Sequence, residues 1–371
     1  MAITHPVGGI QTWCKYYYRH PRFREFDIEM IAPLSEECLH LQKAMEPLGI
    51  PVRVTASTIP NFAWETWRSI VNGRWDLVHA HGFTAGDICA PVARLFEVPC
   101  LVTQHDVILD SQYNDFKGKL IRAATRISLA LATRIHSVSE SSAANLAVVV
   151  HDRKATLDRV TVIANGIDSK AFYAAPVADL RSELGLNADD FLIGFFGRYM
   201  KQKGFVTLMD ALQLLLARTP PLARRPVIVA VGSGAYRTSE ERKVAALGLQ
   251  ANVRFIDFRP LVASLLKAVD VIAVPSLWEA CGLIAMEALV CGTPLIASDC
   301  DGLAEVTART PATQFPMEDA AALAAAIEAH LATDHRPAAR EFAESAAKRY
   351  SADPLAADVA ALYEELLARG H

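Results

Sequence analysis

Short apolar runs alternate with helical patterns along the whole chain, and this alternation restricts the possible fold more than any other feature. The strand-like runs are 27–33, 76–82, 99–105 and 134–139 in the first half, and 191–197, 226–232, 252–257, 269–276 and 293–298 in the second. Amphipathic or apolar helical patterns lie between them, at 34–47, 84–96, 205–218 and 317–332. Strands that alternate with helices form parallel sheets covered by helices on both faces. The sequence therefore predicts an α/β protein with Rossmann-like parallel sheets.

The length and the restart of the pattern indicate two domains. A chain of 371 residues exceeds one ordinary domain, and the strand–helix pattern begins again after a Pro- and Ala-containing stretch around 165–180. We predict an N-terminal domain over 1–175, a C-terminal domain over 176–350 and a terminal helical segment over 351–371. The first strand is a stub, because only Met1–Thr4 precede the first loop, and we expect this to weaken the centre of the N-terminal sheet.

Composition and charge exclude several classes of protein. No apolar run reaches the roughly 18 residues that span a bilayer, and the first residues lack the pattern of a secretory signal. The seven cysteines are scattered without a CxxC pair, so neither a disulfide framework nor a zinc site is indicated. The formal net charge of −4 argues against nucleic acid as a partner. We expect a cytoplasmic protein that binds no nucleic acid.

Two glutamates lie at the end of one strand-like run. Glu287 is in the middle of a helical pattern that is apolar all round, which predicts a buried helix. A carboxylate in such a helix needs a partner. Glu279 lies eight residues earlier, directly after the run 269–276, at the end of the strand where open α/β sheets bind ligands. The pair therefore predicts a ligand site, and a salt-bridged structural glutamate is the alternative.

A second cluster predicts an anion site. Arg198 and Lys203 lie in the loop GRYMKQKG (197–204), which follows the strand-like run 191–197 and ends in a glycine that opens a helix. The N–H groups at a helix start and the cations of Arg and Lys both favour phosphate. An exposed turn with solvated charges is the alternative for this loop.

Three further motifs are weak when each is taken alone. Gly232 lies in VGSG after a strand, where glycine allows close backbone approach, although a tight turn without ligand explains it as well. Gly8 and Gly9 open the first helix and form a second candidate phosphate or sugar contact. His105, followed by Asp106, ends the strand-like run 99–105 and is either a ligand contact or a structural histidine. No GxGxxG dinucleotide fingerprint follows any strand.

Taken together, these motifs resemble those of the family 4 retaining glycosyltransferases, which have the GT-B fold. The glycine-rich opening, HAHG (79–82), TQHD (103–106), SVSE (137–140), VIANGID (162–168), the Arg/Lys loop, VGSG and the E-x7-E pair occur in the family's order. The E-x7-E pair in EACGLIAMEAL (279–289) is the most specific of them. One departure is Asp301, which replaces the first glycine of a pair that keeps Gly302.

The resemblance implies an architecture and a reaction. Two Rossmann-like domains would face each other across a cleft, with the acceptor on the N-terminal domain, the nucleotide-sugar on the C-terminal domain, and the helix of 351–371 crossing back to the first. The protein would be a retaining hexosyltransferase that moves a sugar from a nucleoside-diphosphate donor, UDP in preference to GDP, to a glycan, lipid-linked or small-molecule acceptor, as in polysaccharide biosynthesis. No other cofactor is expected. The D-x-D of Asp299 and Asp301 lies inside this family's segment, so we do not interpret it as a metal site.

The resemblance also implies roles for the candidate residues. Arg198, Lys203 and the N–H groups near Gly282 and Leu283 would meet the diphosphate charge, and Glu287 would accept the ribose hydroxyls. Glu279 and His105 would contact the sugar, and the base would lie near Phe258 and Arg259. The catalytic set is then His105, Arg198, Lys203 and Glu279. The donor-binding set is Gly8, Gly9, Gly232, Phe258, Arg259, Gly282, Leu283 and Glu287.

Two questions stay open at this stage. A nucleotide-sugar epimerase of the same fold, or a relative that binds the donor without catalysis, would carry much of the same pattern. The segment 113–126 places Tyr113 and Phe116 beside Lys117, Lys119 and further basic residues at helical spacing. It is either an ordinary solvated helix or a peripheral contact with the inner face of a membrane, as expected for a lipid-linked acceptor.

Overall fold

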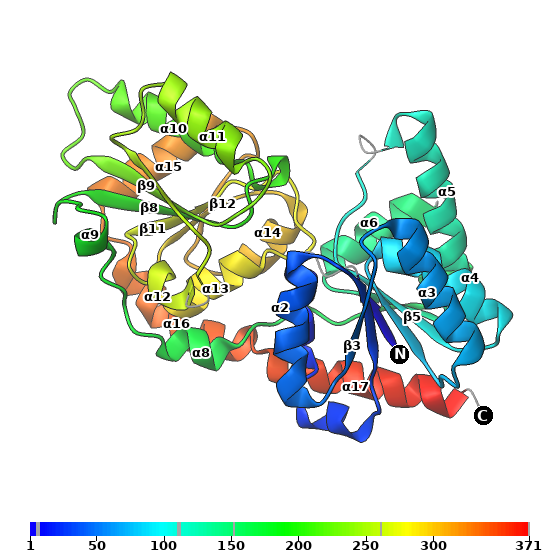
Figure 1. Cartoon of the computed structure of the whole chain (residues 1–371). Helices are drawn as coiled ribbons and strands as arrows, with labels where there is room; N and C mark the ends of the chain where they lie inside the picture. The colour runs from blue at the N-terminus through cyan, green and yellow to red at the C-terminus, as the bar shows by residue number, and fades with distance from the viewer. Residues whose placement is uncertain (5–7, 110–112, 151–152, 260–261, 370–371) are drawn as a thin grey trace. The chain divides into compact units, whose positions relative to one another are not determined.

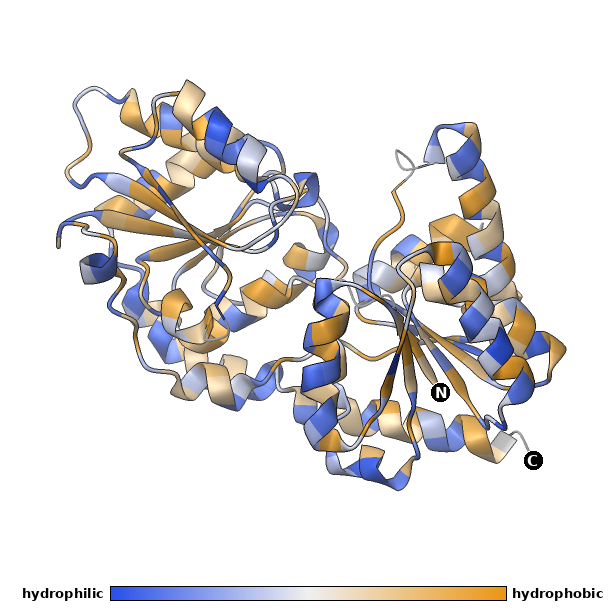
Figure 2. Cartoon of the chain, viewed as in Figure 1, coloured by the Kyte–Doolittle hydropathy of each residue, from blue (hydrophilic) through white to orange (hydrophobic). Residues whose placement is uncertain are grey.

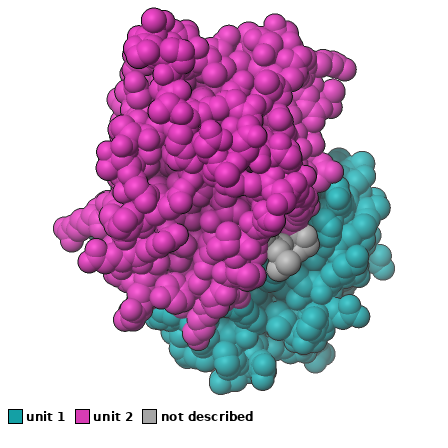
Figure 3. Space-filling view, turned by 90° about the vertical axis from the view of Figure 1, so that its left-hand side faces the viewer, with its two compact units in different colours: residues 1–166, 352–371 teal, residues 167–351 magenta. Residues whose placement is uncertain are grey.

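The computed structural model describes residues 1–4, 8–109, 113–150, 153–259 and 262–369. The chain forms two compact units, one of residues 1–166 with 352–371 and one of residues 167–351 (Figure 3). The boundary predicted at 175/176 falls after helix α8 (Ser169–Ala174), which packs on helices α13 (Leu283–Cys291) and α16 (Arg336–Arg349) of the second unit.

The first unit is built on a parallel sheet of seven strands (Figure 1). In spatial order these are β3 (Val52–Thr55), β2 (Met30–Pro33), β1 (Ala2–Thr4), β4 (Val78–His81), β5 (Cys100–Gln104), β6 (Arg134–Ser137) and β7 (Val160–Val162). The helices of this unit are α1 (Gly9–Tyr17), α2 (Glu36–Met45), α3 (Ile59–Asn72), α4 (Phe83–Leu95), α5 (Phe116–Leu131), α6 (Glu140–Val150), α7 (Lys154–Leu157) and α17 (Ala352–Arg369). Short 3-10 turns lie at η1 (Pro21–Glu25) and η2 (Glu46–Leu48).

The short first strand lies in the middle of this sheet. Although β1 has three residues, it pairs in parallel with both β2 and β4. Ala2, Ile3 and Thr4 are all buried. Helix α17, red in Figure 1, packs on α1 and η1 of the same unit. The end of the chain therefore completes the unit that its beginning starts.

The second unit is built on a parallel sheet of six strands. Their order is β10 (Val253–Ile256), β9 (Pro226–Val231), β8 (Phe191–Phe196), β11 (Val271–Val274), β12 (Leu295–Ser298) and β13 (Thr313–Phe315). Besides α8, α13 and α16, its helices are α9 (Leu180–Glu183), α10 (Phe205–Leu216), α11 (Arg237–Ala246), α12 (Val262–Leu266), α14 (Asp301–Thr307) and α15 (Ala320–Ala332), with a 3-10 turn at η4 (Lys201–Lys203).

The predicted α/β fold with two Rossmann-like sheets is confirmed. Every strand-like run identified in the sequence contains one of these strands. Except for the edge strand β10, these strands lie inside the sheets, where parallel strands are buried on both faces and read as continuous apolar runs. In Figure 2 the strands are mostly coloured as hydrophobic, and the outer helices carry both colours. β3, β7 and β13 are short edge strands with partly exposed residues, and the sequence pattern did not predict them.

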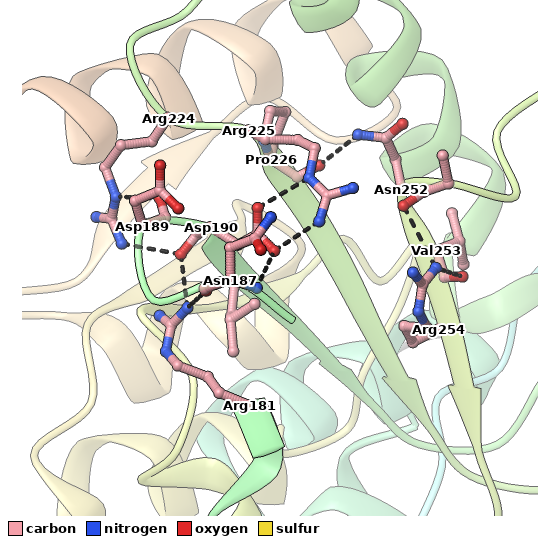
Figure 4. A network of polar contacts seen from close by, with 12 residues as sticks. Arg181, Asn187, Asp189, Asp190, Arg224, Arg225, Pro226, Asn252, Val253 and Arg254 are labelled. Atoms are coloured by element: carbon pink, nitrogen blue, oxygen red, sulfur yellow. Dashed lines mark hydrogen bonds and ion pairs between the residues drawn. The ribbon is translucent and has the colours of Figure 1, made fainter. Parts of the chain in front are cut away.

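Ion pairs occupy the amino ends of the strands in the second unit. Asp190 precedes β8 and pairs with Arg225 (Nη2–Oδ2, 2.6 Å; Figure 4). Asp270 precedes β11, is buried, and pairs with Arg181 (Nη2–Oδ2, 2.8 Å), Arg224 and Arg336. A cavity of about 520 Å³ opens beside Asp270. These charges lie at the opposite end of the strands from the two glutamates of the predicted ligand site.

Candidate active site

Glu279 lies in the loop between β11 and α13 and is held by two donors. The Nζ of Lys203 lies 2.6 Å from its Oε1, and the Oγ of Ser276 donates to the same oxygen at 2.8 Å. The side chain of Glu279 is 10% exposed. Two of the predicted site residues, Lys203 and Glu279, therefore form a partly buried ion pair, which is stronger than a solvated one because little water screens it.

Backbone contacts fix the loop that carries Glu279. The Nε2 of Gln202 donates to the carbonyl of Trp278 (2.8 Å), and the carbonyl of Gln202 accepts from the N–H of Leu277 (2.7 Å). A Cβ at Gly302 would lie 2.2 Å from the carbonyl oxygen of Glu279, so only glycine fits there. Gln202 and Gly302 both lie inside motifs recognised in the sequence, but these supporting roles were not predicted.

The loop that carries Lys203 requires a glycine at the point where it contacts the loop that follows β11. Gly204 has a φ of +65° and precedes α10, and a Cβ on it would lie 1.8 Å from the carbonyl oxygen of Pro275. This close approach places Lys203 directly beside Glu279. Arg198, in the same loop, is half-buried and has neither a hydrogen bond nor an ion pair within the described residues. Its guanidinium is therefore available to a ligand.

Glu287 is buried in α13, as the sequence predicts, and the residue is 9% exposed. It has no hydrogen-bond or ion-pair partner among the described residues, so the alternative of a salt-bridged glutamate lacks a partner there. Burial raises the pKa of its carboxyl to about 8, against a smaller opposing effect of the Lys203 charge. The free protein therefore holds Glu287 largely protonated at neutral pH.

The start of α13 lies between the two glutamates. Gly282 is its N-cap and Leu283 its first residue. The first N–H groups of a helix lack partners within the helix and carry partial positive charge, which favours an anion. The structure thus brings Lys203, Glu279 and the start of α13 together at the carboxyl end of β11.

The remaining donor-site candidates of the second unit have other contacts. A Cβ on Gly232 would lie 1.9 Å from the carbonyl oxygen of Gly197, so close backbone packing explains this glycine without a ligand. Phe258 is 60% exposed. Arg259 pairs with Glu183 of α9 (Nη1–Oε2, 2.9 Å). These residues follow β9 and β10, further along the sheet than the two glutamates.

In the first unit, Gly8 is the N-cap of α1, with a φ of 59°, and Gly9 is the first residue of that helix. His105 directly follows β5, and its Nε2 lies 3.2 Å from Nδ1 of His81. Burial, with the neighbouring histidines as lesser causes, holds the pKa of His105 well below its usual range, so the imidazole is neutral. His105 is only partly exposed, which suits a side chain that contacts a ligand from a packed surface.

Two further observations concern metals and membranes. Oδ1 of Asp299 accepts a hydrogen bond from the N–H of Met317 (2.8 Å), and Asp301 is the first residue of α14. The described part of the chain contains no group of three or more His, Cys, Asp or Glu residues placed to hold a metal ion. Nor does any helix within the described ranges combine the length and the apolar character needed to cross a membrane.

Comparison with known proteins agrees with this arrangement. The family described as "Glycosyl transferases group 1" matches residues 177–349, and "Glycosyltransferase Family 4" matches residues 7–171. D-inositol 3-phosphate glycosyltransferase of Corynebacterium glutamicum is 31% identical over 241 residues, which are 62% of this chain and 57% of that protein. The same-named protein of Thermobispora bispora is 29% identical over 316 residues, 81% of this chain and 72% of its own length. The match spans little more than half the length of the first of these relatives.

Solved structures share the fold over nearly the whole chain. Anabaena Alr3699/HepE in complex with UDP has a TM-score of 0.79 at 20% identity and covers 98% of each chain. Sucrose-phosphate synthase from Thermosynechococcus elongatus has a TM-score of 0.74 at 21% identity and covers 99% of this chain and 98% of its own. At such identities the likeness shows the fold. The chain has both sheets and the E-x7-E pair, and the two family matches together extend from residue 7 to residue 349 apart from a short gap. The chain therefore belongs to the family 4 glycosyltransferases of the GT-B fold.

Proposed function

We propose that this protein is a retaining glycosyltransferase that moves a sugar from a nucleoside-diphosphate donor to a glycan, lipid-linked or small-molecule acceptor. The observation that carries the proposal is the arrangement at the end of β11. There an ion pair of Lys203 and Glu279 lies beside a helix start, and a buried Glu287 has no partner among the described residues. Cations and helix N–H groups favour binding of a diphosphate, and a carboxylate can accept hydrogen bonds from both hydroxyls of a ribose.

The chemistry assigned to these residues follows from the charge that develops. Negative charge builds on the diphosphate as the bond to the anomeric carbon breaks. Arg198, Lys203 and the first N–H groups of α13 meet that charge, and loss of one such preorganised donor costs about 3 kcal/mol of transition-state stabilisation. Side chains and a helix start thus take the role that a metal ion has in other glycosyltransferase folds.

Glu287 and Glu279 divide the contacts with the donor. Glu287, protonated in the free protein, releases its proton to solvent as the donor binds, and its carboxylate then accepts both ribose hydroxyls, which compensates its burial without a salt bridge. Glu279, already held by Lys203 through one oxygen, offers its second oxygen to sugar hydroxyls. His105 contacts the sugar from the first unit. UDP is the nucleotide we assign in preference to GDP, because Alr3699/HepE has been solved with UDP and with UDP-glucose.

A thermal-shift panel with UDP, GDP, ADP and their sugar conjugates tests the donor site. A ligand that binds only the folded protein adds about 2.7 kcal/mol of stability at a hundredfold excess over its Kd. We expect a shift with UDP and UDP-sugars that Glu287→Gln removes, because an amide cannot accept both hydroxyls as a carboxylate does. A panel without any shift, or an equal shift in the variant, would contradict the proposed site.

Product analysis separates the enzyme from its alternatives. With the donor found, the protein is offered glycan, lipid-linked and polyol acceptors, including an inositol phosphate because the named relatives act on one. We expect transfer with the donor's anomeric configuration retained, read from the anomeric proton coupling of the product. An altered sugar released without acceptor would indicate the epimerase. Donor binding without any turnover would indicate a non-catalytic relative.

We further propose that α5 contacts the inner membrane face of the cell while the protein remains cytoplasmic. Three large apolar side chains of this helix, Phe116 (78%), Leu120 (56%) and Ile127 (58%), are mostly exposed. Lys117 and Lys119 lie exposed beside them. Apolar residues next to cations on one helix suit an anionic lipid surface.

Vesicle co-sedimentation tests this surface. We expect the protein to pellet with phosphatidylglycerol vesicles at low salt, and less with phosphatidylcholine vesicles. The double variant Phe116→Ser/Leu120→Ser should lose most of this binding, since it removes the apolar contact and leaves both lysines. Leu95→Ser, which removes an equally exposed apolar side chain from α4 (76%), is the matched control. Absence of binding to anionic vesicles would rule the contact out.

A further inference from the structure

A continuous chain of hydrogen bonds crosses the core of the first unit. It runs from the backbone carbonyl of Ile163 to the imidazole of His105, through three other histidines, one threonine and two tyrosines. All the side chains along it are buried except His105, which is partly exposed. Such a chain has a direction if the group at one of its ends can only accept or only donate a hydrogen bond.

The carbonyl of Ile163 sets that direction, because it can only accept. The Nε2 of His136 lies 2.9 Å from it and therefore carries the ring's proton. Burial lowers the pKa of His136 to about 4, so the ring has only that one proton at neutral pH. Nδ1 of His136 is then an acceptor, and the hydroxyl of Thr103 donates to it across 3.1 Å.

The next two links follow by the same reasoning. Since the Thr103 proton points to His136, the Thr103 oxygen accepts from Nε2–H of His79 at 2.6 Å. The pKa of His79 lies well below its usual range because the ring is buried, with nearby histidines as lesser causes, so it too carries one proton. Nδ1 of His79 is left to accept, and the hydroxyl of Tyr363 donates to it at 2.5 Å.

Tyr18 provides the only hydrogen-bond link among the described residues between this part of the chain and His81. Its hydroxyl lies 3.1 Å from that of Tyr363, 2.8 Å from Nε2 of His81 and 3.4 Å from Nδ1 of His79, whose lone pair the closer Tyr363 hydroxyl already occupies. Because the Tyr363 proton points to His79, Tyr18 donates to Tyr363 and accepts from Nε2–H of His81. In the reverse arrangement two oxygen lone pairs would face each other across the buried 3.1 Å contact, which is costly.

The same direction of hydrogen-bond donation extends to His105. With its proton on Nε2, His81 has a lone pair on Nδ1, and His105 donates to it from Nε2–H across 3.2 Å. A neutral His105 then has a lone pair on Nδ1, which has no hydrogen-bond partner within the described part of the chain. The outer nitrogen of this ring is an acceptor.

We propose that Tyr18 is a positioning residue that fixes the tautomer of His105, so that its Nδ1 accepts a hydrogen bond from a hydroxyl of the donor sugar. The sugar contact rests on the proposed function, whereas the tautomer rests on the hydrogen bonds alone. Tyr18 touches no reacting atom in this account. It acts by transmitting the direction set at the Ile163 carbonyl, and it thereby selects donors that offer a hydroxyl at this point.

The tautomer can be read directly in the full-length protein. With histidine labelled by ¹⁵N in the ring, long-range ¹H–¹⁵N spectra show which nitrogen carries the proton, and His105→Gln identifies the His105 signals. We expect the proton on Nε2 of His105 in the unsubstituted protein. In Tyr18→Phe the link to His81 is lost, and we expect a mixture of both tautomers. A proton on Nδ1 of the original protein, which requires no variant to fold, would overturn the proposal.

Tyr17→Phe is the matched control. Tyr17 is the last residue of α1, directly precedes Tyr18 and is also buried. Its hydroxyl donates to the carbonyl of Ala164 (3.0 Å) and accepts from the N–H of Gly166 (3.1 Å). Removing it deletes buried hydrogen bonds outside the histidine chain, so the His105 signals should stay as they are. An unchanged His105 tautomer in folded Tyr18→Phe would contradict the positioning role.

Kinetics then test the sugar contact. We expect Tyr18→Phe to lower kcat/KM about tenfold, as for one oriented hydrogen bond, with the Kd for the free nucleoside diphosphate unchanged. Tyr17→Phe should retain the original kcat/KM. A shifted tautomer with unchanged transfer would overturn the role of Nδ1 in sugar binding. If the original protein transfers no sugar, the proposed function fails, and the tautomer measurement still decides the role of Tyr18.

Discussion

Glu287→Gln should stabilise the second unit of the free protein by about 3 kcal/mol at pH 7. The pKa of Glu287 is raised by burial from 4.5 to about 8, so between these values the folded state holds a proton that the unfolded state has lost. The free energy of unfolding therefore falls with rising pH across this window, by about 1.4 kcal/mol per pH unit. Glutamine has the same shape and does not titrate, so it avoids this loss.

The pH dependence of the difference in stability between the variant and the original protein provides an internal control. Hydrogen exchange at amides of β8, β9 and β11 reports the stability of the second unit by itself, which a single unfolding curve of a two-domain protein does not. The advantage of the variant should vanish near pH 4.5 and grow towards pH 8. A variant that is less stable than the original protein at pH 7 would mean that Glu287 has a partner in the free protein.

This prediction connects stability to the proposed function. A carboxylate that costs stability in the free protein is retained where ligand binding requires it, and the ribose hydroxyls are the donors that would compensate it. The same substitution should therefore stabilise the free protein and remove the nucleotide-induced shift. Loss of binding together with loss of stability would instead point to a damaged fold.

Acidification should destabilise the first unit strongly between pH 6.5 and about 4. Burial lowers the pKa of His136 from 6.5 to about 4, and the pKa values of His79, His81 and His105 lie well below their usual range for the same main reason. The unfolded state therefore binds more protons than the folded state in this window, and the free energy of unfolding falls as the pH falls. His136 by itself accounts for about 3 kcal/mol.

Hydrogen exchange at amides of β4, β5 and β6 measures this loss at a series of pH values, after correction for the intrinsic exchange rate. Asp87, whose pKa burial raises, opposes the effect where carboxylates titrate, so the steepest loss is expected above that range. His136→Gln should be less stable overall but show a shallower pH dependence. His40→Gln, at an exposed position on α2, is the control and should follow the original protein. A flat profile from pH 6.5 to 5 would contradict the neutral histidine chain.

The sequence determined by itself the central strands, the two-sheet fold and the edge at which the ligand site lies. Strands such as β8 and β11 are buried on both faces, so their apolar runs are continuous and need no tertiary information to be found. The carboxyl ends of parallel strands share one edge, so Glu279 and Lys203, each placed after a strand, could be expected to lie close together.

The tertiary structure decided which side chains touch. Glu279 pairs with Lys203, and Arg259 pairs with Glu183. Gly232 packs on the backbone of Gly197. None of these contacts has a signature at a fixed spacing in the sequence. The histidine chain joins Tyr18 to Tyr363, two residues 345 positions apart. Local pattern encodes burial and periodicity, which are properties of single segments. A hydrogen bond between distant segments depends on packing geometry at the scale of an ångström, and only the folded chain fixes that.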